Sequence, residues 1–491
     1  MSAGALAELD SKAKSAFGSY VVRKELVQSH EISRLPRFIS EYLVAKFYPS
    51  GEPTQDDIRK LQDFVTVHFP ELRDKDKILH DIMTQGSYTL MDEFKVETDI
   101  KGATHRLFIP CLNIRDAKVL PTILDENTDL LRSGMWGVAT LKYLPDGDQT
   151  KESDTSPVLM TKFTPFEVVN VKLSEFASKR QLFTRSEWID LLVRSIGLNP
   201  DSYNHHQKLL LLLRLVPLVE PNCNVLELGP KATGKTYLYR NISYSTRLIA
   251  GGRVGPATLF YNIATKTVGE IGVRDCVVLD EIGKLTFSNS EEMIGKLKDY
   301  MVDGFFERGP KKAHASASMV FMGNAEFGSS GDSSAPSTRD IVSALPHFMR
   351  DSALLDRIHC FIPGWELPKI MQSSEHLASG YGIVADYLSE VFHQMSMQGS
   401  YSDIFWDRVK IESSTQEGVT IREEKAIKKV ASGMLKLLCP DKACEEQDIT
   451  IAMKVAVEGR QRVNALLSSI SPEEFDKDKD IKFSPKSASI P

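Results

Sequence analysis

The sequence lacks the cysteine pairs and apolar spans that mark several protein classes. Its six cysteines form no C-x-x-C pair, so their spacing does not predict a zinc site, and no structural metal is expected. The leucine run at residues 209–213 is followed by Arg214 and Pro217, far short of the roughly 20 residues that a membrane-spanning helix needs. The first residues lack the basic-then-apolar pattern of a signal peptide. We therefore expect a cytoplasmic chain in a reducing compartment, without membrane contact.

The sequence also lacks an excess of positive charge and any internal repeat. A net charge of −6 argues against wholesale coating of nucleic acid, although a ring with basic residues confined to its bore stays compatible with it. The length of 491 residues allows roughly two to four domains. Apolar content of 42% and charged content of 26% are typical of a soluble globular protein.

Residues 229–236 have the sequence GPKATGKT, which matches the phosphate-loop pattern G-x-x-x-x-G-K-[ST]. An apolar strand is predicted before this loop and a helix after it, so backbone N–H groups and the helix N-terminus would attract phosphates. Lys235 would reach the β- and γ-phosphates, and the Thr236 hydroxyl would hold Mg²⁺. The alternative is a glycine-rich turn that matches by chance. The predicted ATP-binding residues are Gly229, Pro230, Lys231, Ala232, Thr233, Gly234, Lys235 and Thr236.

A second element, residues 275–281 (DCVVLDE), is a continuous apolar run that ends in two carboxylates. Such a run predicts a strand buried on both faces of a parallel sheet, with its carboxylates at the ligand-binding edge. Asp280 would bind Mg²⁺, directly or through water, and Glu281 would polarise the attacking water. Because this strand follows a phosphate loop, the order predicts ATP hydrolysis with ATP and Mg²⁺ as cofactors.

Two further polar residues follow predicted strands or helices. Asn324 comes after the apolar residues 317–322, where its amide could bind the water or the γ-phosphate; alternatively it begins a turn. Arg357 lies between a helix end and an apolar strand in residues 353–363 (ALLDRIHCFIP). That position suits an arginine finger inserted into a neighbour's ATP site, and the alternative is a surface arginine paired with Asp356. The predicted catalytic residues are Glu281, Asn324 and Arg357.

These four elements, in this order and spacing, resemble those of AAA+ ATPases. The sequence around them resembles that of the BrxL family, the Lon-related AAA+ proteins of bacterial BREX phage-defence systems. The segments that carry this resemblance are 188–200 (WIDLLVRSIGLNP), 219–230 (VEPNCNVLELGP), 297–301 (LKDYM) and 359–366 (HCFIPGWE). It extends from about residues 34–38 to Val463. It implies a ring-forming ATPase, hexameric or a stacked double hexamer, that encircles duplex DNA largely independently of sequence, with other BREX proteins as possible partners. It also implies a resemblance in organisation to the replicative MCM helicases.

The expected fold is an α/β AAA+ ATPase core with a helical C-terminal lid, preceded by a helical region and a β-barrel, which the MCM likeness suggests is OB-like. The expected domains are a helical region at 1–85, the barrel at 86–175, a helical connector at 176–202, the ATPase core at 203–370, the lid at 371–470 and a disordered tail at 471–491. We expect so short an end to leave no room for a Lon-type protease domain.

The sequence indicates contacts to DNA less clearly. Lys311 and Lys312 stand at a turn in residues 307–314 (ERGPKKAH), together with Arg308, where helicase-type AAA+ rings carry a hairpin that points into the bore. Arg253 stands in a glycine-rich loop. Both segments could equally be solvated turns. An alternative function is a protein unfoldase, although residues 287–293 are mostly polar, unlike the aromatic pore loop of such a machine.

Overall fold

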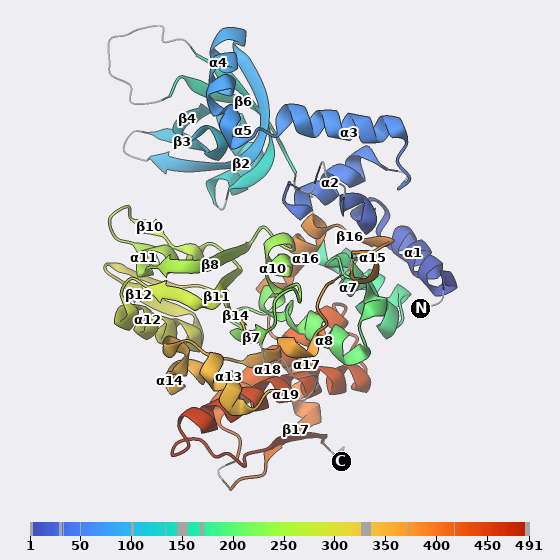
Figure 1. Cartoon of the computed structure of the whole chain (residues 1–491), viewed down its shortest axis with the longest axis vertical. Helices are drawn as coiled ribbons and strands as arrows, with labels where there is room; N and C mark the ends of the chain where they lie inside the picture. The colour runs from blue at the N-terminus through green and yellow to red at the C-terminus, as the bar shows by residue number, and fades with distance from the viewer. Residues whose placement is uncertain are drawn as a thin grey trace. The chain divides into compact units, whose positions relative to one another are not determined.

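The computed structural model describes residues 3–28, 32, 34–49, 51–99, 103–132, 134–144, 156–166, 171–325, 335–371, 373–416 and 418–486 (Figure 1). The chain divides into two compact units. One is formed by residues 26–170, and the other by residues 1–25 together with residues 171–491.

The unit of residues 26–170 contains a closed five-stranded barrel, as the sequence predicts. Its strands are β2 (Ser87–Asp99), β3 (Thr104–Ile109), β4 (Ile114–Val119), β5 (Met135–Tyr143) and β6 (Val158–Pro165). They close in the order β2-β3-β4-β6-β5, with β4 and β6 parallel and the other pairs antiparallel. The OB-like character of the barrel stays a prediction. Closure leaves the barrel without an open sheet edge.

Helices accompany the barrel within this unit. They are α2 (Arg37–Phe47), α3 (Gln55–His68), α4 (Lys75–Gln85) and α5 (Pro121–Glu126). The helix α3 begins at Thr54, whose hydroxyl accepts from the Asp57 N–H while the Asp57 carboxylate accepts from the Thr54 N–H. From α4, Ile78 and Ile82 join the apolar core of the barrel.

The larger unit is built on a five-stranded parallel sheet. Its strands, in spatial order, are β15 (Cys360–Pro363), β7 (Val225–Gly229), β14 (Ser318–Asn324), β11 (Cys276–Phe287) and β8 (Thr246–Val254). Every residue of β7 and β15 is buried. Strands covered on both faces read as continuous apolar runs, which is why the sequence predicts β7, β11 and β14. The glycine-rich loop expected around Arg253 is wrong, because Arg253 belongs to the edge strand β8, whose largely unburied residues form no apolar run.

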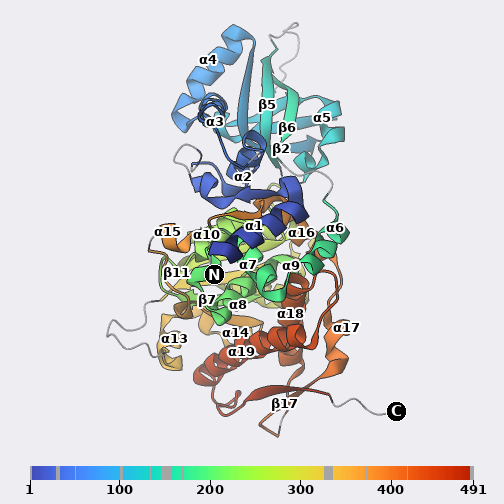
Figure 2. The same cartoon turned by 90° about the vertical axis from the view of Figure 1, so that its right-hand side faces the viewer.

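Helices cover the two faces of this sheet. The apolar core on one face includes residues of α12 (Ser290–Asp303), α13 (Thr338–Ala344), α14 (Ser352–Leu355) and α19 (Glu446–Ile470). On the opposite face lie α8 (His205–Leu213), α9 (Val216–Val219) and α10 (Lys235–Asn241). The long helices α18 (Ile421–Leu438) and α19 run side by side (Figure 2). They belong to the region where the sequence predicts a lid, and that role stays a prediction.

The remaining helices and strands complete this unit. They are α1 (Ala3–Phe17), β1 (Val21–Arg23), α6 (Leu173–Lys179), α7 (Arg185–Ser195), α11 (Pro256–Leu259), β9 (Tyr261–Asn262), β10 (Thr267–Val268), β12 (Phe305–Arg308), β13 (Lys311–His314), α15 (Ser373–His376), β16 (Tyr381–Ile383), α16 (Ala385–Met397), α17 (Ser402–Phe405), β17 (Val409–Ser413) and β18 (Ile481–Pro485).

The chain's first 25 residues differ from the expected helical domain at 1–85. They belong to the ATPase-containing unit, where α1 buries Leu9, Ala13 and Phe17 and β1 pairs with β16. The apolar residues at positions 9, 13 and 17 lie four apart and form one face of the helix, which explains its docking. The expected connector at 176–202 is likewise part of this unit, with α7 buried from Trp188 to Ser195.

The expectation of a disordered end from Ser471 is wrong for residues 471–486. There β18 pairs antiparallel with β17, and Ile481 is buried. The charged residues 473–480 dominate the composition of this segment, so the sequence predicts disorder and gives no sign of the short strand that follows them. Residues 487–491 lie outside the described part of the chain. Among the described helices, none combines the length and apolar character needed to cross a membrane.

Candidate active site

The phosphate loop joins the carboxyl end of β7 to the start of α10. A Cβ atom at Gly229 would lie 2.5 Å from the backbone of Gly364, so the close approach of β7 to the segment after β15 requires glycine there. The loop turns through Ala232 and Gly234, with φ angles of 64° and 79°. Ala232 is thus a non-glycine residue in the left-handed region, a strain found at ligand-binding sites.

Lys235 lies inside the loop. Its ammonium donates to the carbonyl oxygens of Gly229 at 3.0 Å and Pro230 at 2.7 Å, and the residue is only 4% exposed. Burial lowers the pKa of Lys235. A phosphate oxygen in the loop would compete with the two carbonyls for the ammonium and favour its charged form.

Thr236 and Asp280 meet across the sheet edge. The Thr236 hydroxyl donates to Asp280 Oδ2 at 2.6 Å, and Asp280, near the end of the buried run in β11, is 4% exposed. Magnesium in nucleotide sites takes one or two protein oxygens and completes its shell with phosphates and water. A hydroxyl and a carboxylate at this distance therefore fit Mg²⁺ as the sequence predicts.

Glu281 differs from its neighbour because β11 bulges at this point. Asp280 pairs with Ala250 and Leu285 pairs with Gly252, so the four residues 281–284 stand opposite the single residue Gly251. Glu281 has a φ of 51°, in the left-handed region, and its carboxylate lies 3.2 Å from the Lys284 ammonium. Bulges next to active sites redirect side chains, and this one directs the Glu281 side chain away from the buried surroundings of Asp280.

Asn324 is the last residue of β14, the strand between β7 and β11, and pairs in register with Gly229. It is exposed, whereas the rest of the strand is buried. Parallel strands end at the same edge of the sheet, so the amide lies between the phosphate loop and Asp280. The structure thus brings Lys235, Asp280, Glu281 and Asn324 together at one edge.

Arg357 lies at the opposite edge. It precedes β15, whose first residue, Cys360, pairs with Val225 at the start of β7. The phosphate loop begins at the other end of β7, about 13 Å away along the extended strand. The Arg357 guanidinium donates to the carbonyl oxygen of Lys298 at 2.7 Å and to that of Ala353, rather than to Asp356.

Sequence reasoning missed Arg214, which follows α8 and is fully buried. Its guanidinium forms a fork with the Glu227 carboxylate, at 3.0 and 2.6 Å, and donates to the Thr233 carbonyl of the phosphate loop at 2.9 Å. Glu227 sits inside β7 and is also fully buried. A carboxylate within an otherwise apolar strand was the one signal in the sequence that could have indicated a buried cationic partner.

The segment with the candidate DNA-binding residues forms a hairpin. The strands β12 and β13 pair antiparallel around Gly309 and Pro310, so Lys311 and Lys312 begin β13. The Lys312 side chain is 67% exposed and lies 3.2 Å from Glu307. Successive residues of a strand point to opposite faces, so the two lysines flank the hairpin tip on both sides.

The two candidate arginines differ in availability. Arg308 is held inside the fold, where it donates to the Tyr261 carbonyl and to Glu292 at 3.1 Å. The sequence expectation that it contacts DNA is therefore poorly supported, because its donors are used within the chain. Arg253 lies exposed near the end of β8, opposite Thr286 of β11.

Comparison with known proteins covers nearly the whole chain. Residues 158–481 match the family described as "Lon-like protease BrxL-like, ATPase domain", and residues 15–143 match "BREX system Lon protease-like protein BrxL N-terminal". The "Lon-like protease BrxL" of Escherichia coli O9:H4 (strain HS) is 32% identical over 99% of this chain and 68% of its own length. The protein of that name from Bacillus cereus (strain H3081.97) is 32% identical over 97% of this chain and 69% of its own length.

Proposed function

Because this chain belongs to the BrxL family of Lon-like ATPases of BREX phage defence, we propose that it is an ATP-hydrolysing ring protein that encircles duplex DNA in that defence. One observation carries the proposal. Five side chains suited to ATP chemistry gather at one edge of the sheet, while Arg357 lies at the other edge of the same sheet. A site that uses all six side chains must be completed by a neighbouring subunit.

The proposed chemistry assigns one task to each side chain. Lys235 and the loop backbone hold the β- and γ-phosphates. Thr236 and Asp280 would hold Mg²⁺, which when bound offsets charge on the phosphates. Glu281 orients and polarises the attacking water, and Asn324 fixes that water or the γ-phosphate. A neighbour's Arg357 stabilises the charge of the transition state, as arginine fingers do.

Two features support DNA as the partner. The β12–β13 hairpin presents Lys311 and Lys312 at its tip, in the segment where helicase-type AAA+ rings carry a bore hairpin. The closed barrel has five strands, the number found in the OB-folds that bind oligonucleotides. Lysines that contact phosphates without reading bases would give sequence-tolerant binding. The proposed assembly is a hexamer, single or as a stacked pair, and other BREX proteins are proposed partners.

We further propose a cytoplasmic location, which the free state of all six cysteines supports. The function is tested by measuring the ATPase rate with duplex DNA and, separately, with an unfolded protein. Stimulation by DNA alone is expected. Stimulation by the unfolded protein alone would contradict the proposal and favour a protein remodeller, and the same incubation would reveal any cleavage of that protein.

A further inference from the structure

The backbone around Arg357 is held from two sides. On one side, Asn224 donates from its side-chain amide to the Arg357 carbonyl at 3.4 Å, and its own carbonyl accepts from the His359 N–H at 2.8 Å. Asn224 is fully buried and directly precedes β7. The strand that ends in this subunit's phosphate loop therefore also fixes, at its other end, the peptide that carries Arg357.

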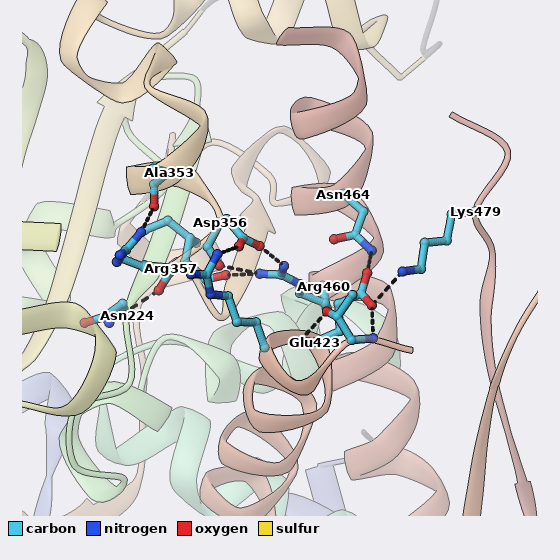
Figure 3. Close-up of polar contacts among 11 residues, drawn as sticks. Asn224, Ala353, Asp356, Arg357, Glu423, Arg460, Asn464 and Lys479 are labelled. Carbon is cyan, nitrogen blue, oxygen red and sulfur yellow. Dashed lines mark hydrogen bonds and ion pairs between the residues drawn. The ribbon is translucent and has the colours of Figure 1, made fainter. Parts of the chain in front are cut away.

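On the other side, Arg460 of α19 holds the two residues that flank Arg357 (Figure 3). One of its terminal nitrogens donates to the carbonyl oxygen of Asp356 at 3.0 Å and to that of Ile358 at 2.8 Å. The other terminal nitrogen donates to the Asp356 carboxylate at 2.5 Å. Arg460 is 1% exposed, so these three bonds form out of solvent and fix both the turn and its distance from α19.

The helix that carries Arg460 is itself fixed. A Cβ atom at Gly459 would collide with the sulfur of Cys360, so α19 is pressed against the strand that follows the Arg357 turn. The same helix is tied to α18, because Asn464 donates to the Glu423 carboxylate at 2.6 Å. Glu423 also caps α18 by accepting from the Thr420 N–H at 2.7 Å.

Arg422 has a different relation to the same carboxylate. It donates to Asp356 Oδ2 at 2.5 Å, but its side chain is 57% exposed and it is bonded to none of the backbone carbonyls of the turn in the described contacts. The exposed pair contributes little to holding a geometry, because solvent screens it and the side chain loses rotamer freedom. Arg460 is thus the arginine that grips the turn.

We propose that Arg460 is a positioning residue for Arg357: it clamps the backbone of Asp356 and Ile358 so that the Arg357 guanidinium is presented to the neighbour's ATP. This inference rests on the proposed function, in which Arg357 acts in a neighbouring subunit. Arg460 would therefore affect the turnover of a site to which it does not belong, and leave its own subunit's ATP binding intact.

The substitution Arg460→Lys tests this role, because lysine keeps the positive charge opposite Asp356 but lacks the second nitrogen that lets arginine bind the two carbonyls and the carboxylate together. We expect kcat for ATP to fall at least about tenfold with little change in KM, since an arginine finger acts in the transition state. Arg194→Lys is the matched control. Arg194 is also 1% exposed and ion-paired to an aspartate, Asp10, but it lies far from the turn in sequence.

Mixed rings show whether a substitution impairs the ATP site of its own subunit or that of the neighbouring subunit. In equal mixtures of Lys235→Ala and Arg357→Ala subunits, about a quarter of the interfaces combine an intact loop with an intact finger, so activity returns. Arg460→Lys subunits should likewise be rescued by Lys235→Ala subunits and not by Arg357→Ala subunits. If Arg460→Lys chains do not assemble, Asp356→Asn replaces them, because it weakens the bond between Asp356 and Arg460. Asp356→Asn subunits should also be rescued by Lys235→Ala subunits and not by Arg357→Ala subunits.

The outcomes distinguish a failure of the positioning role from a failure of the proposed shared ATP site. Rescue of Arg460→Lys by Arg357→Ala subunits, or wild-type kcat in Arg460→Lys rings, would overturn the positioning role. So would an absence of rescue by Lys235→Ala in a mixture where Arg357→Ala is rescued. If Lys235→Ala and Arg357→Ala fail to complement each other, the shared ATP site itself is refuted, whatever Arg460→Lys does.

Discussion

At the residue scale, Asp280 and Glu281 are adjacent carboxylates with opposite surroundings. Asp280 is buried and bonded to Thr236, whereas Glu281 stands in a bulge with positive φ. The first environment suits a metal-binding carboxylate that stays in place. The second suits a group that must face water. One local irregularity of the backbone therefore assigns two roles to two neighbouring acids.

Substitutions at the ATP site should separate binding from hydrolysis. We expect Lys235→Ala to abolish nucleotide binding, because it removes the charge that offsets the phosphates. Glu281→Gln should bind ATP but turn it over at least ~100-fold more slowly, the scale of losing a positioned catalytic group. Binding is measured with a fluorescent ATP analogue and turnover by phosphate release. Glu291→Gln, an exposed acid in α12, is the control. Wild-type turnover in Glu281→Gln would refute the assignment.

The buried pair Arg214–Glu227 should be costly to break. Arg214→Met leaves Glu227 charged and unpaired, so we expect a loss of about 3–5 kcal/mol in the free energy of unfolding. The double substitution Arg214→Met/Glu227→Leu should lose much less stability, because it removes both charges. Denaturant unfolding measures both. Equal losses in the single and double variants would show that the ion pair is not the cause.

His359 should make the protein sensitive to mild acid. Burial, with the nearby Lys429 and Arg460 charges, holds the pKa of His359 well below its ordinary value of about 6.5. Its Nδ1 accepts from the Asn224 N–H at 2.8 Å, so the folded state requires the neutral ring. The unfolded chain takes up a proton below pH 6.5 and the folded chain does not, so stability is present above that pH and is lost as the pH falls.

The expected slope for this one group approaches 1.4 kcal/mol per pH unit below pH 6.5. Denaturant unfolding between pH 7 and pH 5 measures it. His359→Gln, which can still accept from the Asn224 N–H, should flatten the slope, while His347→Gln, at an exposed position, should not. An unchanged slope in His359→Gln would rule out this histidine as the source.

At the scale of elements, strands were easier to predict than their irregularities. The apolar runs before Gly229 and Asp280 predict β7 and β11, because strands buried on both faces have no polar alternation to obscure them. The bulge at residues 281–284 has no such pattern in the sequence, because it is a shift in pairing against the partner strand β8. Likewise, Arg214 meets Glu227 only because α8 packs on β7, and β18 forms only because β17 offers it an edge.

The β12–β13 hairpin should bind DNA through phosphates. Replacing Lys311 and Lys312 with alanine should weaken affinity equally for unrelated duplexes, and each lost phosphate contact should remove about 0.9 from the slope of log affinity against log salt. Fluorescence anisotropy across a salt series measures this. The antiparallel strand pair β17–β18 offers a control, because Lys410 and Lys482 are also exposed lysines of a two-stranded sheet. An unchanged slope in the β12–β13 variant would place DNA binding elsewhere, and the barrel would be the next surface to test.

At the scale of the whole molecule, the proposed ring should be held together partly by its own substrate. ATP would contact its own phosphate loop and the neighbour's Arg357, and a hydrogen bond to a charged group contributes about 1.5–3 kcal/mol. Glu281→Gln, which keeps ATP uncleaved, should therefore form rings that resist dilution when ATP and Mg²⁺ are present. By the same arithmetic, ATP should tighten each interface by about tenfold or more.

Mass photometry during dilution tests this coupling between catalysis and assembly. Adding Arg357→Ala to Glu281→Gln should return the ring fraction to its level without ATP, because nucleotide still binds but no longer bridges two subunits. Lys235→Ala rings should not respond to ATP at all. If the Glu281→Gln protein and the double variant show the same ring fraction at every dilution, Arg357 does not reach a neighbour's nucleotide. The site at the phosphate-loop edge would then have to be complete within one chain.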